Sequence, residues 1–479
     1  MSNEAQGSQS MWGGGMKWVA GLIVVGGVAV GGVSEAEGAA PSSAPPAVSR
    51  RGQVDLASLT TEQWIEDLDA LAKGLAERHI DPFTRCSRES FDAAVAELRG
   101  RIPSLSTEAR LIALSRIAAL LDDSHTSVAV DQFARRLRLL PIRIVWLEDG
   151  FFVMAATATH QTLLGRRVLS IGSLPIEEVA TRLRTIVASD NDGAARVRFS
   201  TISAFADVLQ AIGAVESNQS VAIALVAGAP VDPAAHPTAD PAKGDSPKEA
   251  APESRGPAAA EEIVTLETSA PMRSSALVLA PDPKSGALPV SRQPMNGNYW
   301  FAVDAPNDVV YLRYERCTED ADRPIWALAS AILQASEGLK QPRLVIDLRQ
   351  NPGGNSLVIR PLIDALAGAA AFQKPHAVTV LIGPRTQSSA SMNAAELRQR
   401  LAATLIGQPT GQRPNHFGEL KSFTLPNSGL PVKHSTRYFR PVAGDPEAVM
   451  PDVVVPLTSA DSFSFDDAAY RAAIALPRD

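Results

Sequence analysis

Two apolar runs constrain the fold of this 479-residue chain more than any other feature. Residues 344–348 (LVIDL) and 378–382 (VTVLI) consist mainly of β-branched and aliphatic side chains, which is typical of strands buried on both faces of a sheet. The first run leads into a Pro-Gly-Gly turn at residues 352–354. The second leads into Ser388 and Ser389 at the start of a predicted helix. This succession of strand, turn and helix predicts an α/β core.

The paired serines and the glycine turn have a chemical interpretation and a structural one. A helix N-terminus presents unpaired N–H groups and the positive end of the helix dipole, so an oxyanion forming beside Ser388 or Ser389 would find donors there. Glycines also let the turn approach a substrate closely. Each signal alone is common for structural reasons, because serines often cap helices and Gly-Gly often marks a turn. Together they favour an acyl-transfer site.

Five motifs in the same order resemble those of the tail-specific (C-terminal processing) serine proteases, in the branch that holds the tricorn core and the retinoid-binding repeats of the eye. The motifs are DDSHT (122–126), DLRQNPGGN (347–355), TQSSA (386–390), IGQPTG (406–411) and PDVVV (451–455). The resemblance runs from about residue 60 to the C-terminus, with one insertion. It implies a serine-type peptidase, a hydrolase whose protease core is a crotonase-like spiral of ββα units.

The chain divides into four parts, which together predict a mixed α/β (α+β) fold. Residues 1–53 contain an apolar run typical of a signal peptide or anchor, followed by a proline-rich linker. Residues 54–135 show helical periodicity after a capping box formed by Thr60 and Gln63, which predicts an N-terminal helical bundle. Residues 136–297 alternate short strands with turns and resemble part of a PDZ domain, so we expect a degenerate PDZ-like, β-rich module. Residues 298–479 contain the protease core, whose strands we expect to include residues 421–425 (KSFTL).

Composition and charge indicate which kinds of partner the protein can bind and where in the cell it is expected. A formal charge of −7 with scattered arginines gives no basic surface, so nucleic-acid binding is not expected. The apolar run within residues 1–53 predicts export to the periplasm or secretion, and an uncleaved run would attach the protein to a membrane. Residues 227–262 are rich in proline, alanine and charged residues, which predicts a disordered insertion at the tip of a hairpin.

A serine nucleophile needs a base and a group that orients the base. The resemblance assigns the nucleophile to Ser388, two residues after the threonine of its motif. Bacterial processing peptidases use a lysine as base, but Arg413 stands at that position and a guanidinium does not give up its proton. The tricorn-like branch uses a histidine, which matches His125, although a histidine could also end a helix here and stabilise its dipole. For the orienting group we expect Glu447, with Glu419 as the competitor.

The resemblance also implies an oxyanion hole, formed by the backbone of Gly353 or Gly354 together with Ser389. The expected reaction is attack on a peptide carbonyl of a polypeptide substrate, formation of an acyl-enzyme, and hydrolysis. No cofactor motif is present, and the spacing of the histidines predicts no metal site.

Two alternatives remain at this stage. The same core could serve as a non-catalytic ligand-binding protein, as in the retinoid-binding repeats, or as a scaffold, which Arg413 at the lysine position would suit. The chain has two cysteines, Cys86 and Cys317. They could pair in an exported protein, but we expect two buried free thiols. Neither lies in a motif, which argues against a cysteine nucleophile.

Overall fold

The computed structural model describes residues 54–128, 137–228, 260–269, 277–279, 290–293, 297–464 and 467–478. The predicted export segment, residues 1–53, lies outside these ranges, and so do residues 229–259 of the predicted insertion. Among the described residues, no helix combines the length and the apolar character that a bilayer crossing requires.

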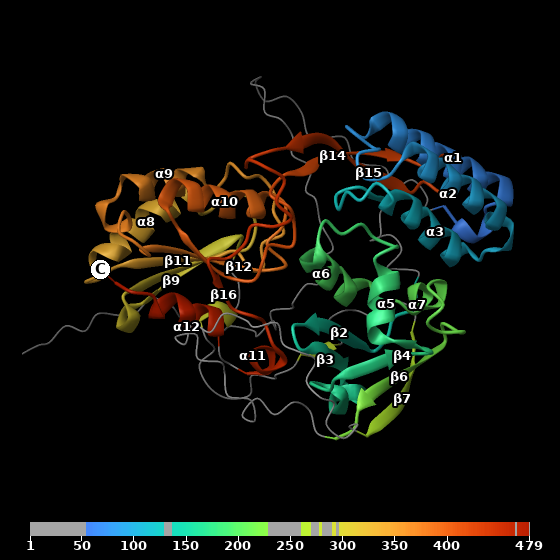
Figure 1. The fold of residues 1–479 in the computed structure, drawn as a ribbon, viewed down its shortest axis with the longest axis horizontal. Coiled ribbons are helices and arrows are strands. Elements are labelled where there is room, and N and C mark those ends of the chain that lie inside the picture. Colours follow the sequence, from blue (N-terminus) through green and yellow to red (C-terminus); the bar gives the residue numbers. More distant parts are fainter. Residues whose placement is uncertain are drawn as a thin grey trace, which may run out of the picture.

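Three helices form the N-terminal part, as the sequence predicts: α1 (Thr61–Arg78), α2 (Arg88–Arg101) and α3 (Thr107–Ala119). The predicted capping box is present, because Thr60 accepts from the Gln63 amide and Gln63 accepts from the Thr60 amide. The apolar face of α1 is fully buried, and each such side chain contributes about 1.5–3 kcal/mol to folding. The three helices pack together at one end of the molecule (Figure 1).

A long hairpin from the C-terminal half packs against these helices instead of entering the core. Its strands, β14 (His416–Thr424) and β15 (Pro431–Phe439), form a sheet with β1 (Ser127–Val128), in the order β1-β15-β14. We expected part of β14 to complete the core sheet, and that prediction is wrong. The turn of the hairpin donates backbone N–H groups of Asn427 and Ser428 to the buried Asp67 carboxylate of α1. The ring of Phe423 fills the space beside Gly74.

The middle of the chain forms two small antiparallel sheets. One contains β2 (Ile142–Leu147), β3 (Gly150–Thr157) and β8 (Leu277–Leu279), and the other β4 (Val168–Ile171), β5 (Leu174–Pro175), β6 (Ser220–Val226) and β7 (Glu261–Glu267). Helices α5 (Ile176–Leu183), α6 (Asp192–Ile202) and α7 (Ala206–Ala211) pack beside them. Strands β6 and β7 pair from Ser220 with Glu267 to Val226 with Glu261, so the predicted hairpin around the insertion is confirmed.

The core is a six-stranded sheet in the order β16-β13-β12-β11-β10-β9. Its strands are β9 (Tyr299–Asp304), β10 (Val309–Tyr314), β11 (Arg343–Asp347), β12 (Val378–Ile382), β13 (Thr404–Gly407) and β16 (Val453–Val454). All neighbours are parallel except β9 and β10. Every residue of β11 and of β12 is buried, as their apolar runs predict. The mixed α/β fold with N-terminal helices is therefore confirmed.

Helices cover both faces of this sheet, which explains why its central strands are apolar throughout. Helices α8 (Ile325–Glu337), α9 (Arg360–Gly368) and α10 (Ser389–Leu401) lie on one face, and α12 (Ala468–Ala475) lies on the other (Figure 1). The short α11 (Ser459–Phe463) lies between the core and the middle sheets. Because β11 and β12 are parallel neighbours, the loops that follow them emerge at the same edge of the sheet.

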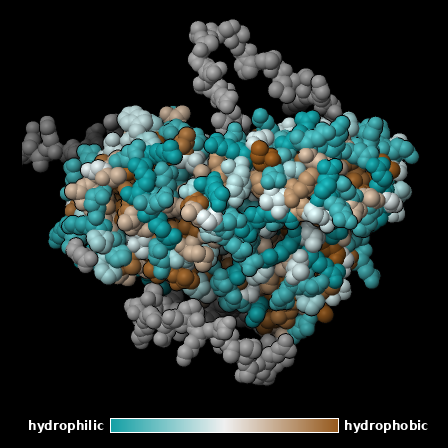
Figure 2. Space-filling view, turned by 45° about the horizontal axis from the view of Figure 1, so that its top comes forward, coloured by the Kyte–Doolittle hydropathy of each residue, from teal (hydrophilic) through white to brown (hydrophobic). Residues whose placement is uncertain are grey.

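The surface is predominantly hydrophilic on the face shown in Figure 2, where apolar residues occur in small, separate groups. Trp326 and Leu357, two of the large apolar side chains that are more than half exposed, come from different segments of the core. Isolated apolar residues of this kind are usual on protein surfaces and do not mark a docking surface.

Candidate active site

Ser388 stands at the turn between β12 and α10 in a strained backbone conformation. Its φ of 49° and ψ of −129° lie outside the regions that L-residues favour, at a cost of about 1–3 kcal/mol. The surrounding turn holds it there, because buried Thr386 donates to the Leu348 carbonyl at the end of β11 and accepts from the Gly383 amide. The Ser388 side chain makes no capping hydrogen bond, so the interpretation of Ser388 as an ordinary N-cap does not apply.

His125 is held by a turn that is organised around Asp123. The Asp123 carboxylate accepts from the His125 amide (2.9 Å) and from three side chains, those of Thr126 (2.6 Å), His79 (3.0 Å) and Ser435 (2.7 Å). Burial by itself would raise the pKa of Asp123, but the hydrogen bonds and the nearby His125 outweigh it, so this pKa lies well below its ordinary value. The carboxylate thus joins α1, the His125 turn and the long hairpin.

The two turns bring His125 and Ser388 together. His125 Nε2 lies 3.1 Å from Ser388 Oγ, although the two residues are 263 positions apart in the chain. This is the distance that proton transfer between an imidazole and a hydroxyl requires. Helix α3 ends at Ala119, so His125 is not placed at a helix terminus and the dipole interpretation does not apply.

Gln412 lies behind the imidazole, where we expected a glutamate. Its side-chain Nε2 is 3.2 Å from His125 Nδ1 and 2.8 Å from Ser124 Oγ, while its Oε1 accepts from the Ser388 amide (2.5 Å). Ser124 Oγ in turn donates to Asp190 (2.9 Å). The sequence did not predict a role for Gln412. The signal that could have indicated one is its position next to Arg413, in the loop that the family pattern assigns to the base.

Neither expected glutamate meets His125. Within the described residues, the Glu447 carboxylate binds Arg413 (3.2 Å), and its side chain is 79% exposed. Glu419 pairs with Arg437 on the hairpin (3.5 Å). Arg413 also donates to the Asp190 carbonyl (3.1 Å). The structure therefore does not support the expectation that Glu447 or Glu419 orients His125.

The predicted oxyanion residues lie beside Ser388 but differ in what they can donate. The Gly353 amide is already bound to the Asn351 side chain (2.9 Å). In the described part of the chain, the amides of Gly354 and Ser389 donate to no other group, while the Ser389 hydroxyl donates to the Gly354 carbonyl (2.6 Å). Gly353 instead provides space, because a Cβ added to it would lie 2.6 Å from the Ser388 Cβ. Two of the three predicted donors are therefore available.

Both cysteines are free, as expected, and Cys317 is buried while Cys86 is only partly buried. Burial raises the pKa of Cys317 to about 12, so this thiol is not ionised at neutral pH. Within the described ranges, no group of three or more histidine, cysteine, aspartate or glutamate side chains is arranged to hold a metal ion.

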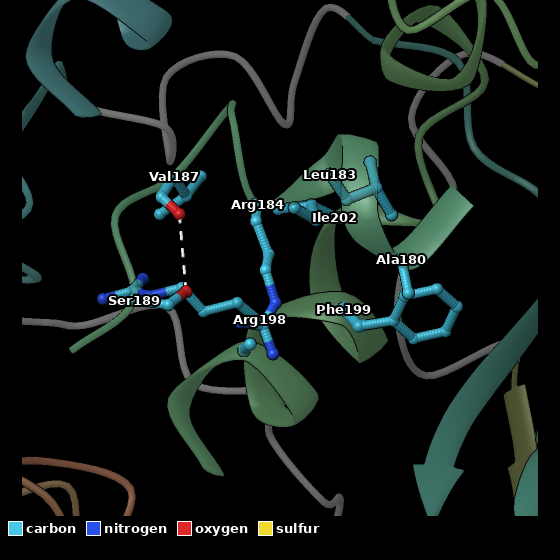
Figure 3. Close-up of a pocket in the computed structure, with 9 residues that line it drawn as sticks. Ala180, Leu183, Arg184, Val187, Ser189, Arg198, Phe199 and Ile202 are labelled. Carbon is cyan, nitrogen blue, oxygen red and sulfur yellow. Dashed lines mark hydrogen bonds between the residues drawn. The ribbon is translucent and has the colours of Figure 1, made fainter. Parts of the chain in front are cut away.

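A small hollow lies between α5 and α6, with Arg198 among the residues that line it (Figure 3). Its volume of about 10 Å³ is far below the range of typical ligand pockets, roughly 300–1,000 Å³. Arg198 lies at its edge, and its guanidinium donates to the carbonyl of Ser124 (2.9 Å). This contact ties α6 to the turn that carries His125.

The buried His416 should make the protein sensitive to mild acid. Its ring stacks on His125, with centroids 5.5 Å apart, and burial, followed by the charge of His125, lowers its pKa to about 4 from an ordinary 6.5. The unfolded chain takes up this proton below about pH 6.5, whereas the folded chain does not until about pH 4. The free energy of unfolding should therefore fall by up to about 3 kcal/mol across that window.

Denaturant titrations at several pH values test this, with His416→Gln expected to remove most of the loss and His160→Gln expected to keep it. Asp123 titrates below this window and does not contribute to it. An identical pH dependence in His416→Gln would contradict the assignment.

The fold is similar to that of S41 family proteases among the solved structures, over most of the chain. Among solved structures, mature CPAF complexed with lactacystin aligns with a TM-score of 0.54 at 14% identity, over 86% of this chain and 97% of its own. Mature CPAF alone aligns with a TM-score of 0.51 at 13% identity, over 86% and 96%. The photosystem II D1 C-terminal processing protease covers 83% and 94% at 14% identity, with a TM-score of 0.34.

No family model and no curated protein matches the sequence. The two CPAF alignments confirm the predicted resemblance at the level of the fold, and identities this low establish the fold alone.

Proposed function

We propose that this protein is a serine-type peptidase that hydrolyses peptide bonds through an acyl-enzyme, with Ser388 as nucleophile and His125 as base. The observation that carries the proposal is the 3.1 Å contact between His125 Nε2 and Ser388 Oγ, made by two segments 263 positions apart in the chain. The strained backbone of Ser388 adds support, since strain of this kind is concentrated at functional sites.

Each residue has a role in the proposed reaction. Ser388 Oγ attacks the peptide carbonyl while His125 Nε2 takes its proton, and the same proton is later given to the leaving amine. The free amides of Ser389 and Gly354 stabilise the oxyanion, and each donor contributes about 2.7–4 kcal/mol in the transition state. A water molecule then attacks the acyl-enzyme while His125 takes its proton, and the proton is returned to Ser388 Oγ as the acid product leaves.

We also propose, from the sequence, that residues 1–53 export the protein and that residues 136–297 form a degenerate PDZ-like module. Cell fractionation tests the first proposal, since a protein found only in the cytoplasm would contradict it. Deletion of the apolar run should then retain the protein inside the cell.

Labelling with a fluorophosphonate probe tests the nucleophile without knowledge of the substrate. We expect the wild-type protein to be labelled on prolonged incubation and Ser388→Ala to remain unlabelled. Ser389→Ala is the matched control, because it removes a neighbouring hydroxyl but keeps the backbone amide, and it should still be labelled. Equal labelling of Ser388→Ala and wild type would contradict the assignment. A folded wild-type protein that is never labelled would favour the non-catalytic alternative.

A further inference from the structure

The hydrogen bonds around His125 form a chain whose direction is determined at both ends. At one end, the Asp190 carboxylate only accepts, so Ser124 Oγ donates to it (2.9 Å) and must itself accept from Gln412. At the other end, the Ser388 amide only donates, so the Gln412 atom that faces it (2.5 Å) must be the oxygen. Gln412 Nε2 therefore donates to both Ser124 Oγ and His125 Nδ1.

This direction determines which nitrogen of a neutral His125 carries the proton. Because Nδ1 accepts a hydrogen bond from Gln412, the proton is on Nε2, and this Nε2–H donates to Ser388 Oγ. A general base needs the opposite arrangement, with a lone pair on Nε2 facing the hydroxyl and a proton on Nδ1. The two side chains are thus in contact, but His125 is in the tautomer that cannot accept the Ser388 proton.

We propose that Gln412 is a latch that keeps the active site in this latent state until a polypeptide substrate displaces its amide. The inference rests on the proposed peptidase function and deepens it. The Gln412 side chain is itself an amide, and its oxygen accepts a hydrogen bond from the backbone N–H of Ser388, the proposed nucleophile. A peptide carbonyl of the substrate offers the same acceptor, so it can replace the Gln412 oxygen on that N–H.

Release of the latch leaves His125 Nδ1 with a different partner. Asp123 Oδ1 lies 3.9 Å from Nδ1 and can accept an Nδ1–H after a small rotation of the ring. One proton then binds Nδ1 from solvent and one leaves Nε2, so the imidazole stays neutral and its Nε2 becomes a base. The other charged or titratable groups around this imidazole are Asp190 through Ser124, Arg198 at the Ser124 carbonyl, and the stacked His416.

The tautomer can be read directly by NMR on protein labelled with ¹⁵N-histidine, with the His125 signals identified by their loss in His125→Gln. We expect the wild-type protein without substrate to carry the proton on Nε2. In Gln412→Glu we expect it on Nδ1, because a carboxylate accepts from both the Ser388 amide and Nδ1–H. A proton on Nδ1 in the wild-type protein would contradict the proposal that Gln412 is a latch. This readout does not depend on activity, so it separates the latch from the proposed function.

The rate of fluorophosphonate labelling gives a second readout. We expect Gln412→Glu to be labelled at least about tenfold faster than wild type, because the wrong tautomer slows serine catalysis by up to about 10⁴-fold. Gln412→Ala should also be faster, since it removes the latch without supplying an acceptor. Gln399→Glu on the exposed part of α10 is the matched control for added charge and should be unchanged.

Slower labelling of both Gln412 variants, with melting temperatures equal to wild type, would overturn the latch and make Gln412 a supporting residue. If no form is labelled, the proposed function fails, and the tautomer measurement alone decides the latch.

Discussion

Replacing Ser388 by alanine should reduce kcat/KM for peptide hydrolysis by a factor on the order of 10⁴ to 10⁶. The alanine removes the oxygen that would form the acyl-enzyme, and the amides of Ser389 and Gly354 alone give only weak catalysis. His125→Gln should lose about as much, because it removes the only imidazole in hydrogen-bond contact with Ser388 Oγ among the described residues. Cleavage of a fluorescent peptide library by each purified variant measures both effects.

The loss should be non-additive, since nucleophile and base act as one unit. The double variant Ser388→Ala with His125→Gln should be no slower than either single one. Ser389→Ala should keep most of the activity, because its hydroxyl only binds the Gly354 carbonyl. Turnover in Ser388→Ala within about tenfold of wild type would remove this serine as the nucleophile.

Replacing Gly353 by alanine should disrupt the site even though it adds only one methyl group. The new Cβ would lie 2.6 Å from the Ser388 Cβ and 3.0 Å from the Ser389 amide nitrogen, and the φ of +105° is unfavourable for any residue but glycine. We expect the free energy of unfolding to fall by about 2–5 kcal/mol. We also expect a loss of at least about 10²-fold in peptidase activity, because Ser388 and the oxyanion donor must move apart.

Gly100→Ala is the matched control for this substitution. Gly100 lies in α2 with nothing within 4 Å of the added Cβ, so alanine there should stabilise the protein by about 0.5–1 kcal/mol and leave activity unchanged. Denaturant unfolding and the peptide assay, run side by side, give the comparison. Equal stability and activity in Gly353→Ala and wild type would mean that the two turns are not packed as described.

Local sequence patterns predicted the secondary structure well where one residue type dominates. The Thr60 capping box and the apolar face of α1 led to a correct helix, and the runs that became β11 and β12 led to buried strands. Strand β14 was assigned to the wrong sheet, because a strand with one apolar face does not indicate which surface covers it. The hairpin that contains β14 is bound by Asp67 of α1, a residue more than 350 positions away in the chain.

The candidate site was predicted only where its residues stand in recognisable local motifs. Ser388 and His125 were found because both stand in short motifs whose order resembles a known family, and the structure brings them into contact. Glu447 was chosen by its position near the last motif, but Arg413 binds it at the surface. Gln412 carried no recognisable motif, and its importance follows only from the groups that face it.

The sequence alone determined which segments become helices and buried strands, and which serine stands at a helix start below a glycine turn. These properties are local, since they follow from periodicity, capping and the freedom of glycine. Only the tertiary structure decided that Gln412 lies behind His125, and thereby which imidazole nitrogen carries the proton in the proposed latch. Hydrogen-bond direction depends on donors and acceptors brought together from four separate segments, around Asp190, Ser124, Gln412 and Ser388, and no local pattern encodes that arrangement.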